Sequence, residues 1–261
     1  IIVVDDGSTD DTAGIISRES GITIITHSKN KGLSSARNSG IEASNSDYIA
    51  FIDSDIIIEK EWLQKTLDLL MSDSSIVGVI GHLAPPITKK DRGLLDRYLF
   101  SNYRGVKKID NKTPLLYKWF VFSNTVIKRH LLEKTGCFDE KICAYGGEDT
   151  ELSVRINKKF PYGLRKAEGA IAYHYSDKSL NVYMKNMYDY GLYNFNYIIK
   201  KHPDYKKKLN GDVPSSFIGY LIFNPLNTSL CSLILKCIKH PLLIKFLVIN
   251  SFVGGVRNSK K

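Results

Sequence analysis

Hydrophobic and polar residues alternate in blocks along the first eighty positions. Apolar, largely β-branched stretches predict four strands, at residues 1–4, 22–26, 48–52 and 76–80. Helical periodicity and capping residues predict three helices between them, at residues 13–20, 33–43 and 59–71. Strands that alternate with helices predict an α/β fold with a mostly parallel sheet flanked by helices.

The pattern becomes less regular from residue 85 to 118. A mobile substrate loop and a pair of helices both fit this segment. Beyond this segment, the pattern predicts strands at 120–127 and 170–175 and helices at 128–134, 151–159 and 180–200. Ligands of such sheets bind outside the carboxyl ends of the strands. The residues that follow each strand are therefore the first candidates for chemistry.

The end of the chain has a different character. Three apolar stretches occupy residues 217–223, 230–238 and 242–256, and polar residues and lysines interrupt or flank them. None contains the roughly 20 uninterrupted apolar residues that cross a bilayer. A segment lying in the membrane interface and a helical subdomain packed on the core both fit this pattern. Residues 177–261 are therefore predicted to form a separate helical C-terminal region.

Charge is distributed unevenly. The chain carries a formal net charge of +10; its positive charge concentrates after Lys200, whereas the first sixty residues are rich in Asp. A basic balance suits phosphorylated substrates or an anionic membrane surface. The sequence has no zinc-finger spacing and no RNA-binding aromatic motif, so nucleic acid is not an expected partner. The four cysteines form no Cys-x-x-Cys pair, which favours a reducing, cytoplasmic environment.

Two aspartates follow the third predicted strand. Phe51-Ile52 leads into Asp53-Ser54-Asp55, so these carboxylates stand at a strand end where they reach a ribose and a metal ion together. A hard cation such as Mg²⁺ or Mn²⁺, held by carboxylates and phosphates, neutralises a nucleotide diphosphate as a Lewis acid. An ordinary acidic turn is the alternative for an isolated Asp-x-Asp, and the position after an apolar strand favours the site.

Two further elements offer groups for a nucleotide. Asp5, Asp6 and Ser8 follow the first strand, where a carboxylate can accept the N–H of a uracil ring or a ribose hydroxyl. Arg37, on the helix predicted at 33–43, can pair with a base or a phosphate through its planar guanidinium. The alternatives are helix capping for the acidic turn and an exposed helix cation for Arg37.

The segment Gly146-Gly147-Glu148-Asp149 contributes candidate acid–base groups. Asp149 can accept the proton of an attacking hydroxyl, and Glu148 can orient that acceptor. Acids at the positive end of a helix dipole are also simply favourable, and both interpretations can hold together. His174 ends the last predicted strand; its imidazole can complete a Mn²⁺ site or serve a structural role.

The order and spacing of these motifs resemble the family-2 glycosyltransferases of the GT-A fold. The resemblance runs from Ile1 to about Ser176 and predicts that residues 1–176 form the nucleotide-sugar-binding and catalytic domain. The stretches that carry it are 3–10, 30–32 with 36–38, 49–55, 136–140 and 146–152. Members of this family normally begin with a further strand and helix, about thirty residues before the position of Ile1.

The resemblance implies an inverting sugar transfer from a nucleotide-diphosphate donor, a UDP-sugar above all, with Mn²⁺ or Mg²⁺. It assigns Asp5 or Asp6 to the base and ribose, Asp53 to ribose or metal, and Asp55 to the metal. Asp149 resembles the catalytic base, and His174 the third metal ligand. The expected acceptor is a hydroxyl of a glycan or lipid-linked molecule in cell-envelope synthesis, with the enzyme at the inner face of the membrane.

Two other functions fit parts of the sequence. A sugar nucleotidyltransferase would need a Gly-rich, Lys/Arg-bearing phosphate loop near residue 1, and the sequence shows none. A non-catalytic nucleotide- or carbohydrate-binding module would bind without turnover. The retention of both Asp53-x-Asp55 and Glu148-Asp149 argues against this second alternative.

Overall fold

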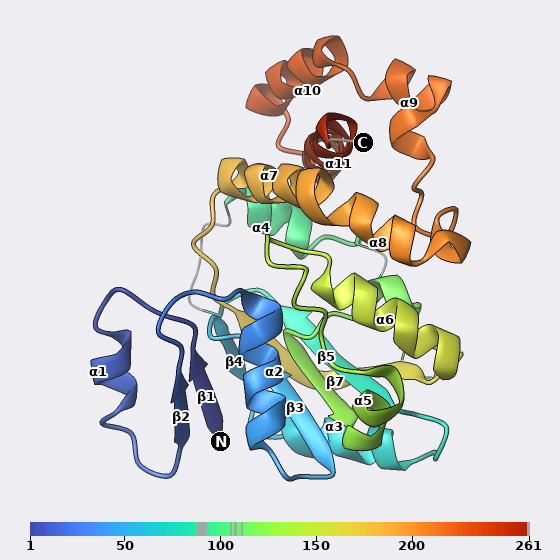
Figure 1. Ribbon diagram of the computed structural model, residues 1–261. Coiled ribbons are helices and arrows are strands. Elements are labelled where there is room, and N and C mark those ends of the chain that lie inside the picture. The colour runs from blue at the N-terminus through green and yellow to red at the C-terminus, as the bar shows by residue number, and fades with distance from the viewer. Residues whose placement is uncertain (88–92, 105, 107–108, 111, 260–261) are drawn as a thin grey trace.

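The computed structural model describes residues 1–87, 93–104, 106, 109–110 and 112–259. In Figure 1, the lower part of the molecule contains the N-terminus and consists of helices and strands. The upper part contains the C-terminus and consists of helices alone. Parts of the irregular segment predicted at 85–118 lie outside the described residues.

The strands form two sheets. Their bounds are β1 (Ile2–Asp5), β2 (Thr23–Thr26), β3 (Tyr48–Ile52), β4 (Ile56–Ile58), β5 (Gly78–Ala84), β6 (Asn124–Lys128) and β7 (Leu164–His174). β1 and β2 pair in parallel as a two-stranded sheet, and the other five strands form a sheet in the order β3-β6-β5-β7-β4. The short strand β4, directly after Asp55, is an element that the sequence pattern did not predict.

Strand direction corrects one expectation, that of a mostly parallel sheet. In the five-stranded sheet only β5 and β7 pair in parallel, whereas β3–β6, β5–β6 and β4–β7 are antiparallel. The Asp53 backbone N–H donates to the Ser123 carbonyl at 2.9 Å, so the chain enters β6 at the end where β3 leaves the sheet. β6 therefore runs against both of its neighbours. Parallel neighbours need a longer crossover connection.

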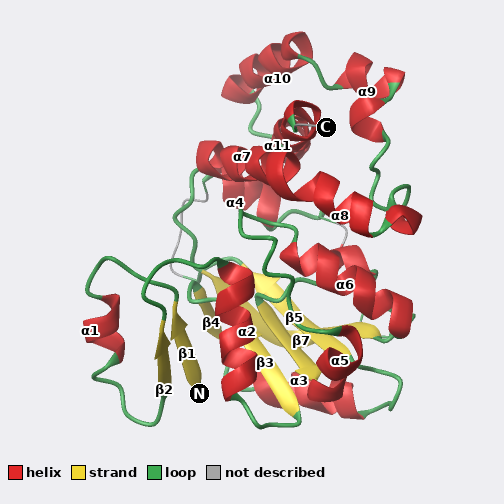
Figure 2. Cartoon of the chain, viewed as in Figure 1, coloured by secondary structure: helices red, strands yellow, loops and turns green. Residues whose placement is uncertain are grey.

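Helices cover both faces of the large sheet (Figure 2). The helices of this part are α1 (Thr12–Ile16), α2 (Leu33–Ala43), α3 (Trp62–Met71), α4 (Leu94–Leu99), α5 (Arg129–Thr135) and α6 (Glu148–Lys159). One core, which includes Ile41, Phe122 and Leu152, joins the sheet to α2, α5 and α6. A second core, which includes Trp62 and Leu70, joins its other face to α3. Burial of these apolar side chains on both faces fixes where each strand end lies.

The C-terminal region is helical, as predicted. It contains α7 (Leu180–Asp189), a π-helical turn (Tyr190–Phe195), α8 (Asn196–Lys201), α9 (Phe217–Ile222), α10 (Pro225–Cys237) and α11 (Pro241–Asn258). A third core lies here, with Leu235 of α10 and Leu247 of α11 packed against Leu95 and Tyr98 of α4. None of the described helices is both long and apolar enough to span a bilayer.

Candidate active site

Arg37, on α2, gathers three carboxylates that lie far apart in the sequence. Its Nη1 donates to Asp149 Oδ1 at 2.7 Å and lies 3.6 Å from Glu148 Oε1. Its Nη2 donates to Asp53 Oδ1 at 3.3 Å. The structure therefore brings together four of the residues that the sequence singled out, from the helix α2, the end of β3 and the first turn of α6.

A pair of glycines sets the direction of α6 and its acids. Gly147 precedes the helix with φ of 99°, a left-handed conformation that glycine adopts without steric cost. A β-carbon there would lie 2.7 Å from a ring carbon of Tyr190 and 2.8 Å from Ile198 Cδ1. Glu148 and Asp149 then fall in the first helical turn, where unpaired backbone N–H groups favour negative charge.

Burial distinguishes the three carboxylates. Glu148 is 7% exposed, whereas the Asp149 and Asp53 side chains are 19% and 37% exposed. Burial, followed by the charge of Asp149, raises the pKa of Glu148 to about 7 despite the opposing effect of Arg37. Burial also raises the pKa of Asp53, assisted by the charges of Asp149 and Asp55, and Arg37 offsets part of this increase. One guanidinium thus leaves this group of acids with uncompensated negative charge.

Asp55 and His174 form a second, smaller group beside the first. The His174 Nε2 atom lies 3.2 Å from Asp55 Oδ2, because β4 and the end of β7 pair at Ile56 and His174. The hydrogen bond from His174 lowers the pKa of Asp55, with further lowering from the charges of His174 and Lys178. A carboxylate oxygen and an imidazole nitrogen are an acceptable donor set for Mn²⁺.

Asp5, Asp6 and Ser8 lie at the end of β1, and the structure assigns their polar atoms local partners. The Ser8 backbone N–H donates to Asp5 Oδ1 at 2.9 Å. Asp6 accepts the backbone N–H groups of Lys31 and Gly32 and lies 2.6 Å from His27 Nδ1. Although burial opposes it, these bonds lower the pKa of Asp6. Asp6 thereby ties the turn after β1 to the loop before α2.

Asn38 connects two of the sequence motifs, residues 36–38 and residues 136–140, by hydrogen bonds. Its amide nitrogen donates to the Phe138 carbonyl, and its Oδ1 accepts the Phe138 backbone N–H, each at 2.9 Å. The Phe138 ring then lies under Arg37, with the guanidinium carbon 5.2 Å from the ring centroid. This contact orients Arg37 toward the carboxylates. Sequence reasoning gave Phe138 no role, although its motif was among those that carry the resemblance.

The C-terminal region also reaches this site, which the sequence did not indicate. Tyr145, just before the two glycines, interacts with Tyr183 and Asn186 of α7 and with the charges of Glu148 and Asp149. Burial is the main reason that the pKa of Tyr145 is raised above its ordinary value. Only the packing of α7 and the following π-helical turn against residues 144–147 reveals such residues.

The predicted metal ligands do not form a single coordination site. Asp55 lies beside His174, whereas Asp53 bonds to Arg37. Within the described ranges, no group of three or more His, Cys, Asp and Glu side chains is arranged to hold a metal ion. Asp55 and His174 are nevertheless close enough to bind one cation together, and other positions would be filled by a ligand such as a diphosphate. Asp53 contributes negative charge next to them while its carboxylate bonds to Arg37.

This arrangement is chemically asymmetric. Asp149 is partly exposed and is available to accept a proton, whereas the neighbouring Glu148 is buried and its pKa is raised. Asp55, two residues beyond Asp53, lies beside His174, and this pair offers a cation site. A base in the first turn of α6 and a metal site at the ends of strands suit the displacement of a diphosphate by a hydroxyl.

Known proteins share this sequence pattern. The chain is similar to the chondroitin synthase of Escherichia coli, with 26% identity over 207 residues, 67% of this chain and 30% of the synthase. It is also similar to the probable glycosyltransferase YdaM of Bacillus subtilis, with 31% identity over 71% of this chain and 45% of that protein. The chain thus spans less than half the length of these two curated relatives.

Solved structures share the fold. The mannosyltransferase PcManGT of Pyrobaculum calidifontis, in complex with GDP-Man and Mn²⁺, superposes with a TM-score of 0.67 at 15% identity. That superposition covers 98% of this chain and 76% of the mannosyltransferase. S. aureus TarS superposes with a TM-score of 0.52 at 15% identity, over 98% of this chain and 49% of TarS. These similarities establish the GT-A fold with its flanking helices and a C-terminal helical region.

The sequence profile of Glycosyl transferase family 2 matches residues 1–136, which include β1, α2, Asp53-Ser54-Asp55 and β6. With the fold and the motif spacing, this match identifies the chain as a member of glycosyl transferase family 2.

Proposed function

We propose that this chain transfers a sugar from a nucleotide-diphosphate donor to an acceptor hydroxyl, with inversion at the anomeric carbon. One observation carries the proposal: Arg37 holds Asp53, Glu148 and Asp149 together beside the Asp55–His174 pair. These groups come from three separate segments of the chain. A core that needed only structural ion pairs would not accumulate three acids around one cation.

In the proposed reaction, Asp149 is the general base. The acceptor oxygen attacks the anomeric carbon on the face opposite the diphosphate, and the bond from that carbon to the diphosphate oxygen breaks. The acceptor proton passes to an Asp149 oxygen, and the nucleoside diphosphate leaves with the bonding electrons. Arg37 holds Asp149 in place, since its Nη1 lies 2.7 Å from Asp149 Oδ1 and 3.6 Å from Glu148 Oε1.

Asp55 and His174 are the proposed ligands for Mn²⁺ or Mg²⁺, and Asp53 is placed to contact either the cation or the ribose. Bound there, the cation would neutralise the departing diphosphate as a Lewis acid. Asp5, Asp6 and Ser8 would organise the base and ribose end of the donor pocket. The bonds of Asp6 to Lys31 and Gly32 would fix the loop that precedes Arg37.

A UDP-sugar is the favoured donor class, with a GDP-sugar as the competitor. TarS has been solved with UDP-GlcNAc, a superposition with a TM-score of 0.50, and PcManGT with GDP-Man and Mn²⁺. Titration calorimetry of UDP and GDP, with and without Mn²⁺, tests the donor and the metal together. We expect metal-dependent binding of one nucleotide, lost in Asp55→Ala and kept in Asp68→Ala, an exposed carboxylate on α3. Metal-independent binding would contradict the metal assignment.

The acceptor is proposed to be a glycan or lipid-linked molecule, with the enzyme held at an anionic membrane surface. The supporting feature is an apolar surface on α9 and α10. Its most exposed members are Phe217 (83%), Leu226 (79%), Ile218 (66%), Leu221 (64%), Leu233 (61%) and Leu230 (55%). Residues 213–261 contain no Asp or Glu. Large exposed apolar patches mark interaction sites, and basic flanks favour anionic lipid.

Vesicle sedimentation tests this attachment. We expect the protein to sediment with phosphatidylglycerol vesicles more than with phosphatidylcholine vesicles, and Leu226→Glu with Leu233→Glu to abolish the effect. The matched control places two glutamates at Leu63 and Met71, which are 48% and 55% exposed on α3. Equal loss in both double variants would mean that added negative charge, rather than this surface, decides the result.

A further inference from the structure

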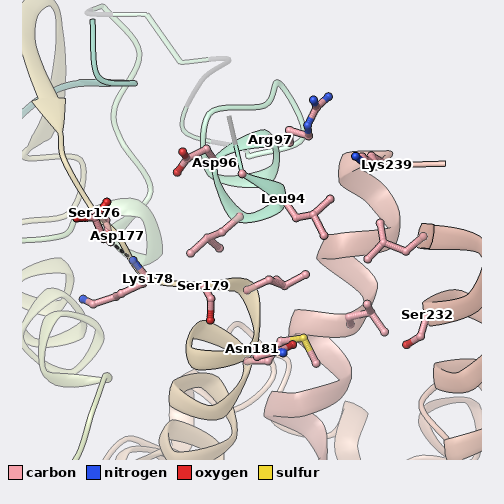
Figure 3. Close-up of a pocket in the computed structure, with 16 residues that line it drawn as sticks. Leu94, Asp96, Arg97, Ser176, Asp177, Lys178, Ser179, Asn181, Ser232 and Lys239 are labelled. Carbon is pink, nitrogen blue, oxygen red and sulfur yellow. Dashed lines mark hydrogen bonds between the residues drawn. The ribbon is translucent and has the colours of Figure 1, made fainter. Parts of the chain in front are cut away.

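A cavity of about 780 Å³ separates the catalytic part of the chain from its C-terminal helices. Its walls come from α4, the segment that follows β7, the start of α7, and α10 with α11 (Figure 3). The first residue of its wall after β7 is Ser176, two positions beyond His174. The cavity therefore begins next to the proposed metal site without containing any of its ligands.

Three cationic side chains line the cavity. Arg97, Lys178 and Lys239 are all exposed, and none of them forms an ion pair with any residue in the described part of the chain. In Figure 3, Lys178 lies on the side of the strand end and Lys239 on the side of α10. Asp96 and Asp177 also line the cavity, but neither of them is free. Unpaired cations around a concavity favour an anionic ligand.

Part of the cavity wall is polar, lined by Ser179, Asn181 and Ser232, and part of it is apolar. Leu94, Met184, Leu235 and Leu247 contribute the apolar part, from α4, α7, α10 and α11 respectively. The helix α10 contributes side chains both to the cavity and to the exposed apolar surface. Leu235 lines the cavity, whereas the neighbouring Leu233 and Ile234 are exposed. An apolar chain in the cavity therefore has a continuous helix to follow toward the apolar surface of α9 and α10.

The opposite wall leads to the chemistry. Lys178 is close enough to Asp55 for its charge to lower the pKa of that carboxyl. On α7, Leu180 and Met184 line the cavity, while Tyr183, between them in the sequence, interacts with Tyr145 beside Glu148 and Asp149. One end of a bound molecule would thus approach the proposed base, and the other would reach α10.

We propose that this cavity is the acceptor site and that it takes a phosphate-bearing amphiphile. Its phosphate groups pair with Arg97, Lys178 and Lys239, and its apolar chain lies on the leucine and methionine wall. This assignment rests on the proposed transferase function and names its acceptor class, a glycan linked to a lipid through a phosphate or diphosphate, whose sugar hydroxyl is the attacking group. A soluble sugar would leave the apolar wall without a partner, and a neutral lipid would leave the cations without one.

Calorimetric titration with monoalkyl phosphates below their critical micelle concentrations tests the assignment. We expect dodecyl phosphate to bind more tightly than octyl phosphate, and inorganic pyrophosphate and dodecyl maltoside to bind at least tenfold more weakly than dodecyl phosphate. Each buried methylene strengthens binding by up to about fourfold, which sets the scale of the chain-length effect. Pyrophosphate binding as tight as that of dodecyl phosphate would identify a soluble phosphate ligand and overturn the lipid assignment.

Charge-matched variants locate the site. We expect the triple variant Arg97→Gln, Lys178→Gln, Lys239→Gln to bind dodecyl phosphate at least tenfold more weakly, since one bond to a charged group contributes about that factor. The control Lys200→Gln, Lys207→Gln, Lys236→Gln removes the same charge from exposed positions outside the cavity and should change binding less than twofold. Met184→Gln should reduce the advantage of dodecyl over octyl phosphate. Equal loss in the two triple variants would overturn the proposal.

Nucleotide titration of the same samples separates this inference from the proposed function. Metal-dependent binding of UDP or GDP without binding of dodecyl phosphate would refute the cavity assignment alone. Binding of dodecyl phosphate at the cavity without any nucleotide binding would refute the transferase function and, with it, the role of the cavity as an acceptor site.

Discussion

Two clusters of buried ionic side chains, both built on α6, differ in their charge balance. Around Arg37, the acids Asp53, Glu148 and Asp149 outnumber the single cation. One turn further along α6, Glu151 is fully buried, and it pairs with Arg155 at 2.6 Å, Lys201 at 2.8 Å and His202 at 3.0 Å. The first cluster is short of positive charge, and the second is compensated.

The pKa values follow this difference. Around Arg37, the pKa values of Glu148 and Asp53 are raised, chiefly by burial. In the second cluster burial also acts, but hydrogen bonds from Arg155, Lys201 and His202 outweigh it and lower the pKa of Glu151. Uncompensated charge has a free-energy cost in the folded state, and binding of a cation or a proton would reduce this cost. Such charge is therefore typical of a functional site. Compensated charge contributes stability instead.

The largest expected effect is on catalysis, from Asp149→Asn. Loss of the proposed general base should lower the transfer rate by a factor of about 10² to 10⁴. Nucleotide binding and the urea midpoint should change little, because the amide retains the shape and one bond to Arg37. Initial rates with saturating donor and metal measure the effect. Wild-type transfer by this variant would refute the assignment of the base.

Glu151→Gln should act on stability rather than on chemistry. Its removal leaves Arg155, Lys201 and His202 around a neutral amide, so we expect a loss of about 2–3 kcal/mol in the free energy of unfolding. Urea denaturation at pH 7 gives this value. The transfer rate of the folded fraction should stay within a few-fold of wild type. An unchanged urea midpoint would contradict the structural role of this cluster.

Glu148→Gln makes the same chemical change in the uncompensated cluster, and its effect on stability should be smaller and of opposite sign. The folded-state pKa of Glu148 lies above its ordinary value of 4.5, so the folded protein holds this proton more tightly than the unfolded chain. Its contribution to stability is therefore favourable at low pH and declines as pH rises from about 4.5 to 7.

The stability of the Glu148→Gln variant should not decline in this way as pH rises. At pH 8 the variant should be more stable than wild type by on the order of 1 kcal/mol. Urea midpoints measured from pH 5 to 8 follow the difference between the two proteins. A loss as large as that of Glu151→Gln would show that the two clusters do not differ in the way proposed.

The smallest effect concerns Asp139, at the edge of the compensated cluster. Burial opposes it, but hydrogen bonds from Lys201 and Tyr197, both at 2.6 Å, lower its pKa to about 2. The folded-state pKa is depressed, so the stabilisation is present above the unfolded pKa near 3.8 and is lost as pH falls toward 2. Asp139→Asn should cost less than about 1 kcal/mol at pH 7 and flatten acid denaturation. Identical acid transitions in both proteins would argue against this interaction.

Much of the N-terminal half was predictable because its elements have local signals. The helix at 33–43 and the strand at 48–52 have the predicted bounds, since a glycine precedes the helix and an apolar run defines the strand. Strand direction had no such signal. It depends on the contact between Asp53 and Ser123, seventy residues apart, which no local pattern specifies. The helix predicted at 180–200 also contains a π-helical turn where it packs against α11.

In the candidate site, too, some residues were predictable from the sequence and their contacts were not. The chemistry-bearing residues stood out because acids at the ends of strands and after a pair of glycines are informative without any neighbours. Their partners were hidden: the Phe138 ring under Arg37, the carboxylate of Asp6 tied to Lys31 and Gly32, and Tyr145 beneath α7. These contacts join segments that only the packing of the core brings together.

The sequence by itself therefore determined the family, the order of most elements before residue 80 and the identity of the candidate catalytic groups, because each depends on residues that are neighbours in the chain. The tertiary structure alone decided that Arg37 faces three carboxylates, that Asp55 meets His174, and that a cavity lined by Arg97, Lys178 and Lys239 opens beside them. The physical reason is that charge balance and burial are properties of a place in the fold, and such places are assembled from distant segments only when the core closes.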